Sequence, residues 1–159
     1  MSASTNTSAP DQVDARGPRF VAWVTTVVII ATLLASAVGP IAAAVVLGAQ
    51  TVVFAIGARR GPRQHPYGLF FQRRVAPRLG PVTEKEPVPP LKFAQLVGFV
   101  FAAVGTVGFA AGVPLVGLIA TGFALVAAFL NAAFGICLGC QIYPLVARAR
   151  KNSRAASPA

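Results

Sequence analysis

The fold class of this protein is decided by the stretch FVAWVTTVVIIATLLASAVGPIAAAVVLGAQTVVFAIGA, residues 20–58, which contains no charged side chain. A second uncharged block covers residues 93–147. Charged side chains are costly in the hydrocarbon core of a bilayer, whereas long apolar segments are stable there. The chain is 55% hydrophobic and 11% charged, about half the charged share of a soluble domain. The sequence therefore predicts an integral membrane protein.

Each block is long enough for two membrane spans, because one span needs about 20 apolar residues. Gly39-Pro40 interrupts the first block and Gly112-Val113-Pro114 the second, and proline cannot continue the hydrogen bonds of a helix. We therefore expect an all-α membrane fold of four transmembrane helices, arranged as two helical hairpins. The expected spans are residues 20–38, 41–58, 93–112 and 115–136, with the last helix continuing past the membrane surface.

These spans define a membrane domain of residues 18–147. A disordered tail, residues 1–17, is expected before it and a basic tail, residues 148–159, after it. A basic loop, residues 59–92, joins the two hairpins. An offset of 73 residues superimposes Phe20 on Phe93 and Gly39 on Gly112, so we expect the hairpins to be parallel internal repeats.

The positive charges predict the orientation. All 14 lysines and arginines lie outside the two uncharged blocks, and neither hairpin turn carries one. Basic segments stay on the cytoplasmic side, so we expect a multi-pass protein of the plasma membrane with both termini cytoplasmic. No nucleic-acid-binding module accompanies the basic residues, which argues against a nucleic-acid partner. The arginines expected to contact anionic lipid headgroups are Arg59, Arg60, Arg73, Arg74 and Arg78.

One alternative concerns the first span. Arg16 and Arg19 precede an apolar run that ends in Ala35-Ser36-Ala37, a pattern that also fits a secretory signal with a small-residue cleavage site. The internal repeat favours a permanent membrane helix instead, because it gives the first span the same place in its hairpin as the third.

Polar groups are few within the spans. No carboxylate lies there, which argues against a proton-coupled transporter. We expect Gln50 and Asn131 to face the bundle and to form hydrogen bonds across it. Close packing through small residues is expected in the third helix and again in the fourth, at a spacing of four residues. The glycines with this spacing are Gly108 and Gly112, and Gly135 and Gly139.

The second block ends with the only two cysteines of the chain, in the stretch FLNAAFGICLGC, residues 129–140. Counting about 20 residues from Pro114 places Cys137 and Cys140 at the cytoplasmic interface, in a reducing compartment where a resting structural disulfide is rare. On a continuous fourth helix they share one face, near its C-terminal end, where the helix dipole disfavours a thiolate. Two interpretations stay open, a redox or sulfur-exchange pair and inert packing.

A metal site is not expected. The two cysteines and the single histidine, His65 in the loop, supply at most three ligands, whereas a closed zinc site takes four. His65 is interpreted as an ordinary loop residue, and no cofactor is predicted.

Four motifs occur in the order ARGPRF, HPYGLFFQRRVAPRLGP, PLKFAQLVGFVFAAVG and FLNAAFGICLGCQIYPL. Together they resemble a family of actinobacterial membrane proteins catalogued as domain of unknown function 4395, over residues 16–147. The resemblance implies a small four-helix membrane protein whose signature includes Asn131, Cys137 and Cys140. It also suggests an association with thioredoxin-like and sulfurtransferase proteins.

The leading hypothesis is a cytoplasmic-face dithiol that exchanges electrons or sulfur with a thioredoxin- or rhodanese-like partner. Cys140 would be the attacking thiol and Cys137 the resolving thiol. The alternatives are a non-catalytic structural or assembly subunit of a membrane complex, and a carrier for a small sulfur species, which would need a homo-oligomer because four helices form a narrow bundle. The sequence leaves open whether the protein is an enzyme.

Overall fold

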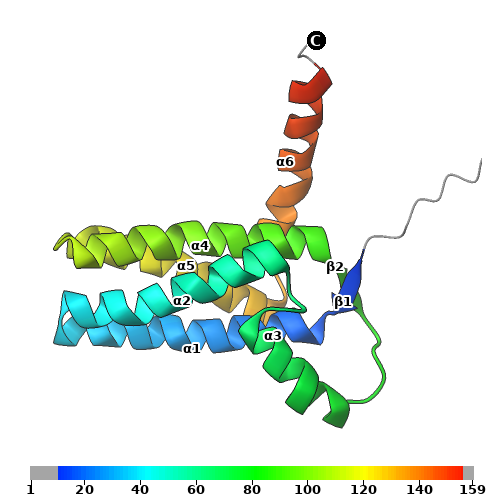
Figure 1. Ribbon diagram of the computed structural model, residues 1–159, viewed down its shortest axis with the longest axis horizontal. Helices are drawn as coiled ribbons and strands as arrows, with labels where there is room; N and C mark the ends of the chain where they lie inside the picture. The colour runs from blue at the N-terminus through cyan, green and yellow to red at the C-terminus, as the bar shows by residue number, and fades with distance from the viewer. Residues whose placement is uncertain (1–10, 156–159) are drawn as a thin grey trace, which may run out of the picture.

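Four long helices form the body of the protein (Figure 1). They are α1 (Arg16–Val38), α2 (Pro40–Arg60), α4 (Val88–Ala110) and α5 (Pro114–Phe134). The structure, a computed structural model, describes residues 11–155 apart from the side chains of residues 151 and 153–155. Each of the four helices is long and apolar enough to cross a membrane. The predicted all-α, multi-pass membrane fold is confirmed.

The predicted breaks within the two blocks are confirmed. Only Gly39 separates α1 from α2, and α5 begins at Pro114, where proline is favourable as the first residue of a helix. Each hairpin pairs a helix of 23 residues with one of 21, the equal lengths that an internal repeat requires. Both hairpin turns lie at one end of the bundle, and the N-terminal strand, the central loop and the C-terminal helix lie at the other (Figure 1).

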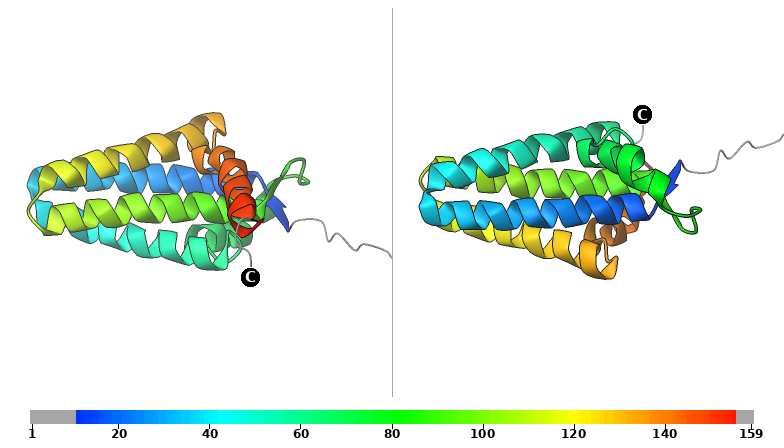
Figure 2. Two further views of the ribbon diagram at one scale, coloured as in Figure 1. Left: turned by 90° about the horizontal axis from the view of Figure 1, so that it is seen from above. Right: turned by 90° about the horizontal axis from the view of Figure 1, so that it is seen from below.

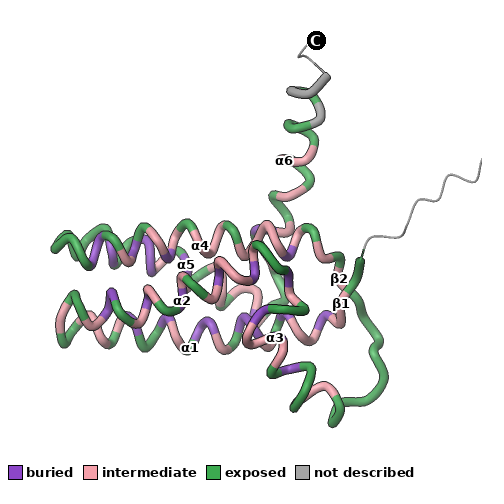
Figure 3. The backbone as a smooth tube through the Cα atoms, in the orientation of Figure 1, coloured by how far each residue is buried: buried purple, intermediate pink, exposed green. Residues whose placement is uncertain are grey.

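The four helices form a ring. α1 packs against α2 and α5, and α4 packs against the same two helices, so α1 and α4 lie on a diagonal (Figure 2). The buried centre includes Leu47, Phe54, Ala102 and Phe109. Large apolar side chains also cover the outside of the bundle, where a soluble protein would be polar. Buried and exposed positions alternate along the long helices (Figure 3). These outer faces fit contact with lipid.

Glycine brings α4 and α5 together at one predicted position. A Cβ atom added to Gly108 would lie 2.7 Å from the backbone nitrogen of Gly117, so only glycine allows this approach. Lipid provides no hydrophobic drive between helices, and such close contacts stabilise the bundle through dispersion. Gly112, in contrast, lies in the turn at a φ of 73°, with nothing near its Cβ position.

A small sheet was not predicted. β1 (Gln12–Asp14) and β2 (Lys85–Pro87) pair in antiparallel orientation, and the Ala15 amide donates a hydrogen bond to the Glu84 carbonyl at 3.1 Å. The sheet ties the start of α1 to the start of α4. The prediction of a disordered tail over residues 1–17 is therefore wrong for 12–17, where strand pairing and the first turn of α1 fix the backbone. Residues 1–10 of that tail lie outside the described residues.

The fourth helix ends earlier than predicted. α5 stops at Phe134, and Gly135 adopts a left-handed φ of 70°. The Gly135 amide donates to the Asn131 carbonyl at 3.1 Å, the single hydrogen bond that closes a helix at a left-handed glycine. A separate helix, α6 (Leu138–Ala155), then leaves the bundle at a steep angle (Figure 1). The predicted continuation past the membrane surface is wrong, because Gly135 terminates the helix instead of packing within it.

The tail predicted for residues 148–159 is not a separate segment where it is described. Residues 148–155 continue α6, which begins ten residues earlier within the predicted membrane domain. Residues 156–159 lie outside the described part of the chain.

The central loop is largely helical. It contains α3 (Pro66–Phe70), a π-helical turn η1 (Phe71–Val75) and a 3₁₀ turn η2 (Ala76–Arg78). The rings of Phe70 and Phe71 pack on Phe20 of α1, with centroids 6.1 and 5.6 Å away. The side of this segment away from α1 carries exposed arginines, Arg73, Arg74 and Arg78.

Candidate redox site

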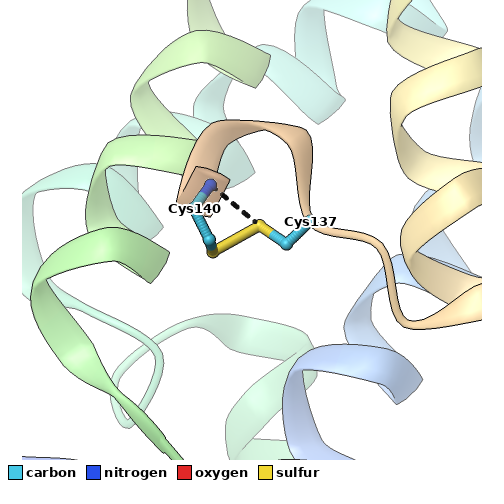
Figure 4. The surroundings of a disulfide bond; sticks show 2 residues. All are labelled: Cys137 and Cys140. Atoms are coloured by element: carbon cyan, nitrogen blue, oxygen red, sulfur yellow. Dashed lines mark hydrogen bonds between the residues drawn. A yellow bond between two sulfur atoms is a disulfide. The ribbon is translucent and has the colours of Figure 1, made fainter. Parts of the chain in front are cut away.

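Cys137 and Cys140 form a disulfide at the start of α6 (Figure 4). Their Cα atoms lie 5.2 Å apart, within the usual range for a disulfide. The amide of Cys140 donates a hydrogen bond to Sγ of Cys137 at 3.3 Å. Cys137 immediately precedes the helix and Cys140 lies in its first turn, so the pair occupies a helix N-terminus.

The electrostatics of the pair differ from the prediction. A helix N-terminus presents unpaired amides and a partial positive charge, which stabilise a thiolate. The prediction placed the pair near the C-terminal end of the fourth helix and inferred an unfavourable dipole. That inference is wrong, because Gly135 ends α5 and lets a new helix begin beside Cys137. CxxC redox proteins of the thioredoxin type use the same position to favour the thiolate.

Gly139 fixes the pair against the bundle. A Cβ atom added to this residue would lie 2.6 Å from Cα of Ala94 and 2.7 Å from Cβ of the same residue. The first turn of α6 therefore rests directly on the backbone of α4. Gly139 therefore has the packing role that the sequence predicted, although it lies in α6 and not in the fourth membrane helix.

An outer cleft of about 320 Å³ borders the disulfide. Both cysteines line it, together with Glu86 of β2 and Gln141 of α6. Burial raises the pKa of the Glu86 carboxyl above its usual value, and the nearby Glu84 raises it further. A carboxyl with a raised pKa beside two thiols can accept or supply the proton that thiol exchange requires.

An inner cavity of about 240 Å³ extends from the pair into the bundle. Its wall includes Cys137 but not Cys140. Asn131 lies on the same wall, so the structure brings this predicted polar residue close to the cysteines. The two sides of the disulfide thus differ, with a cleft on one and an apolar cavity on the other.

Gln50 lies apart from the cysteines. Its side chain is buried, and its Oε1 accepts a hydrogen bond from the Tyr67 hydroxyl at 2.8 Å. The predicted bond across the bundle therefore joins α2 to α3 of the loop instead of joining two spans. Burial raises the pKa of Tyr67. Gln50 anchors the loop at the end of the bundle.

His65 was missed as a site residue. Its side chain is 1% exposed and lies against Gly57, whose added Cβ would be 2.6 Å from the imidazole Cδ2. Burial lowers the pKa of His65 to about 4, opposed by the neighbouring Gln95 carboxamide. A small cavity of about 50 Å³ is lined by both His65 and Cys137. The interpretation as an ordinary loop residue is wrong because the side chain is buried, and no pattern in the sequence indicated that burial.

The remaining predicted residues lie at the same end of the bundle. Arg59 and Arg60 form the exposed last turn of α2, at the end of the bundle where the loop also lies (Figure 1). They do not line the outer cleft.

The comparisons with known proteins identify the family but no activity. The family model described as Domain of unknown function (DUF4395) matches residues 13–148. No curated protein and no solved structure matches the chain. The matched range begins at β1 and includes all four long helices, the loop, and both cysteines. The chain therefore belongs to the family described as Domain of unknown function (DUF4395).

Proposed function

We propose that the protein is a thiol–disulfide exchange protein of the plasma membrane. Its Cys137–Cys140 pair exchanges electrons or sulfur with a soluble thioredoxin- or rhodanese-like protein. One observation carries the proposal: the pair forms a disulfide at the N-terminus of a helix, beside an open cleft. A buried structural disulfide would not need both the thiolate-stabilising position and the opening.

The proposed orientation places this end of the bundle in the cytoplasm. The loop, the start of α1 and the end of α6 carry the positive charges, and the opposite end carries only the two uncharged hairpin turns. The positive-inside rule assigns the charged end to the cytoplasm. Phe70 and the arginines Arg73, Arg74 and Arg78 suit contact with anionic headgroups at that surface.

The orientation predicts which reagents reach the cysteines. In intact cells, after mild reduction, a membrane-impermeant maleimide is expected to leave Cys137 and Cys140 unlabelled, and a permeant maleimide is expected to label them. The matched control replaces both cysteines with serine and introduces Val113→Cys in the exposed turn between α4 and α5. That cysteine should react with the impermeant reagent. A reaction of the impermeant maleimide with Cys137 and Cys140 would contradict the proposed orientation.

The chemistry of the exchange follows from the geometry. A partner thiolate attacks Sγ of Cys140, a mixed disulfide forms, and the S–S bond to Cys137 breaks. Cys137 leaves as a thiolate, which the Cys140 amide stabilises. The second thiol of the partner then displaces Cys140, so the partner becomes a disulfide and the pair a dithiol.

The same pair can also accept a sulfur atom from a persulfide and release it as hydrosulfide. The Cys140 thiolate attacks the terminal sulfur of a rhodanese persulfide and takes it, and the rhodanese cysteine leaves as a thiolate. Cys137 then attacks Sγ of Cys140, the disulfide forms, and hydrosulfide leaves. Two thiols are oxidised to a disulfide, and the transferred sulfur is reduced.

A trapping experiment tests these roles. The Cys137→Ser variant is incubated with a thioredoxin-like protein that lacks its own second cysteine and whose remaining thiol is held in a mixed disulfide with a small thiol. It is expected to release the small thiol and to accumulate a mixed disulfide through Cys140, because neither protein then has a resolving thiol. Non-reducing gel electrophoresis measures the adduct. The Cys140→Ser variant is the matched control and should give little adduct. Equal trapping by both variants would contradict the assigned roles, and no adduct with either would contradict exchange with this class of partner.

A structural subunit is the second candidate, favoured by one feature of α6. This helix stands away from the bundle with Ile142 and Leu145 exposed, at 48% and 65%, a surface that suits another protein of a membrane complex. Replacement of both cysteines with serine distinguishes the two functions. Under the structural role, the growth of the producing strain under oxidant stress should not change, whereas the exchange role predicts a defect. The sulfur carrier and the homo-oligomer stay predictions.

A further inference from the structure

The inner cavity has the character of a ligand site. It lies among α1, α2, α4, α5 and the start of α6, and its volume is about 240 Å³. Phe54, Phe101 and Phe123 contribute aromatic walls. Phe123 is 60% exposed on the outside of the bundle, near the middle of α5, so the cavity reaches the surface that faces lipid. A molecule dissolved in the membrane can therefore enter it from the side.

Two residues that line this apolar space carry buried polar atoms without hydrogen-bond partners among the described residues. Thr25 is 3% exposed, and its hydroxyl has no hydrogen-bond partner among the described residues. The buried Oε1 of Gln95 also meets no hydrogen-bond geometry within that part of the chain, although its carboxamide lies beside His65. Both residues line the cavity together with Asn131. Buried polar groups are almost always satisfied in folded proteins, and a few polar groups in an apolar pocket orient its ligand. The wall offers hydrogen-bond donors and acceptors for a molecule that has both.

The disulfide lies between two spaces of different character. Cys140 lines only the outer cleft, where a soluble protein can approach, whereas Cys137 lines the outer cleft and the inner cavity. After exchange with a soluble partner, the reduced pair needs an oxidant before it can react again. The cavity beside Cys137 can hold one that is confined to the membrane.

We propose that the inner cavity binds the ring of a quinone, which oxidises the Cys137–Cys140 dithiol. The inference rests on the proposed function and adds the second reactant of the same pair. In this step the two thiols become one disulfide and release two electrons and two protons. The quinone accepts both electrons and both protons and leaves as the hydroquinone.

The chemistry of quinones matches each feature of the site. The flat ring fits between aromatic walls. The two carbonyl oxygens accept hydrogen bonds from the Thr25 hydroxyl and the Asn131 amide, and the hydroquinone hydroxyls donate to Oε1 of Gln95. A lipid acyl chain would leave these polar groups unpaired, and a charged soluble oxidant would not enter an apolar cavity.

The test uses the full-length protein, reduced and freed of reductant, in nanodiscs without oxygen. The probe is 2,3-dimethyl-1,4-naphthoquinone, whose substituted ring disfavours irreversible attachment to thiols. We expect loss of quinone absorbance together with formation of one disulfide per quinone. The Thr25→Val variant keeps the shape of the side chain and should need about tenfold more quinone for half-maximal rate. Ala127→Phe, which fills the cavity wall, should slow the reaction at least about tenfold.

Exchange with a thioredoxin-like protein provides the control, because it uses the outer cleft. Both variants are expected to exchange thiols at the parent rate, which also shows that they are folded. Quinone reduction that is equally fast in the parent and in both variants overturns the inference. So does thiol exchange without any quinone reduction in the parent, and in that case the proposed function still holds. Failure of thiol exchange in the parent overturns the proposed function itself.

Discussion

Acidification from pH 7 to pH 5 is expected to lower the free energy of unfolding by roughly 2 kcal/mol, and full protonation of His65 by about 3 kcal/mol. The cause is burial, which lowers the pKa of His65 from 6.5 to about 4. Between these values the unfolded chain binds a proton that the folded protein does not, so stability falls as the pH falls. Reversible unfolding by SDS in mixed micelles, repeated across this pH range, measures the effect.

The His65→Phe variant is the control for this prediction, because it removes the titrating group. The pKa shifts of Glu86 and Asp14 do not lower the free energy of unfolding between pH 7 and pH 5. The raised pKa of Glu86 makes the folded protein bind its proton first, which adds stability as the pH falls. The lowered pKa of Asp14, held by its hydrogen bond to Arg16, has its effect only as the pH approaches and passes below 3.8. A loss between pH 7 and pH 5 that is as large in His65→Phe as in the parent would contradict the assignment.

Replacing Gly139 with alanine is expected to destabilise the protein by about 1–3 kcal/mol, although alanine is the better helix former. The new Cβ would lie 2.6 Å from Cα of Ala94, and a backbone atom can yield only if α6 moves away from α4. The shift should also open the inner cavity at Cys137. We therefore expect faster alkylation of the reduced pair, measured by mass spectrometry, together with a lower free energy of unfolding.

Gly122→Ala provides the matched comparison. Gly122 also lies within a helix, and nothing lies within 4 Å of its Cβ position, so alanine there should be neutral or stabilising by up to about 1 kcal/mol. If Gly139→Ala proved as stable as Gly122→Ala, the contact between α6 and α4 would not fix the cysteine pair.

The spans and hairpins could be predicted from the sequence because charge and proline placement dominate membrane folds. All charged residues lie outside the central parts of the four long helices, and the turn prolines begin α2 and α5. The end of α5 could not be predicted in the same way. Gly135 fits both a packing role and a helix end, and only the backbone conformation distinguishes them. The prediction that the helix dipole disfavours a thiolate at the cysteine pair was wrong for this reason alone.

Contacts between distant segments explain the other differences. β1 pairs with residues more than 70 positions later, and the short segment 12–14 has no local pattern that indicates a strand. His65 is buried only because the loop folds back on Gly57 and Gln95. Within the site, the cysteines and Asn131 could be identified from the residues alone. The cavities beside them depend on how α1, α2, α4, α5 and α6 meet.

The redox state of Cys137 and Cys140 in living cells shows whether the pair takes part in thiol–disulfide or sulfur exchange. Cells are quenched with acid, free thiols are alkylated, and the peptide that contains both cysteines is analysed by mass spectrometry before and after oxidant or thiosulfate stress. We expect a mixture of dithiol and disulfide, or persulfide, whose proportions shift under stress and recover afterwards. A pair that stays in a single state under every condition would contradict the proposed exchange.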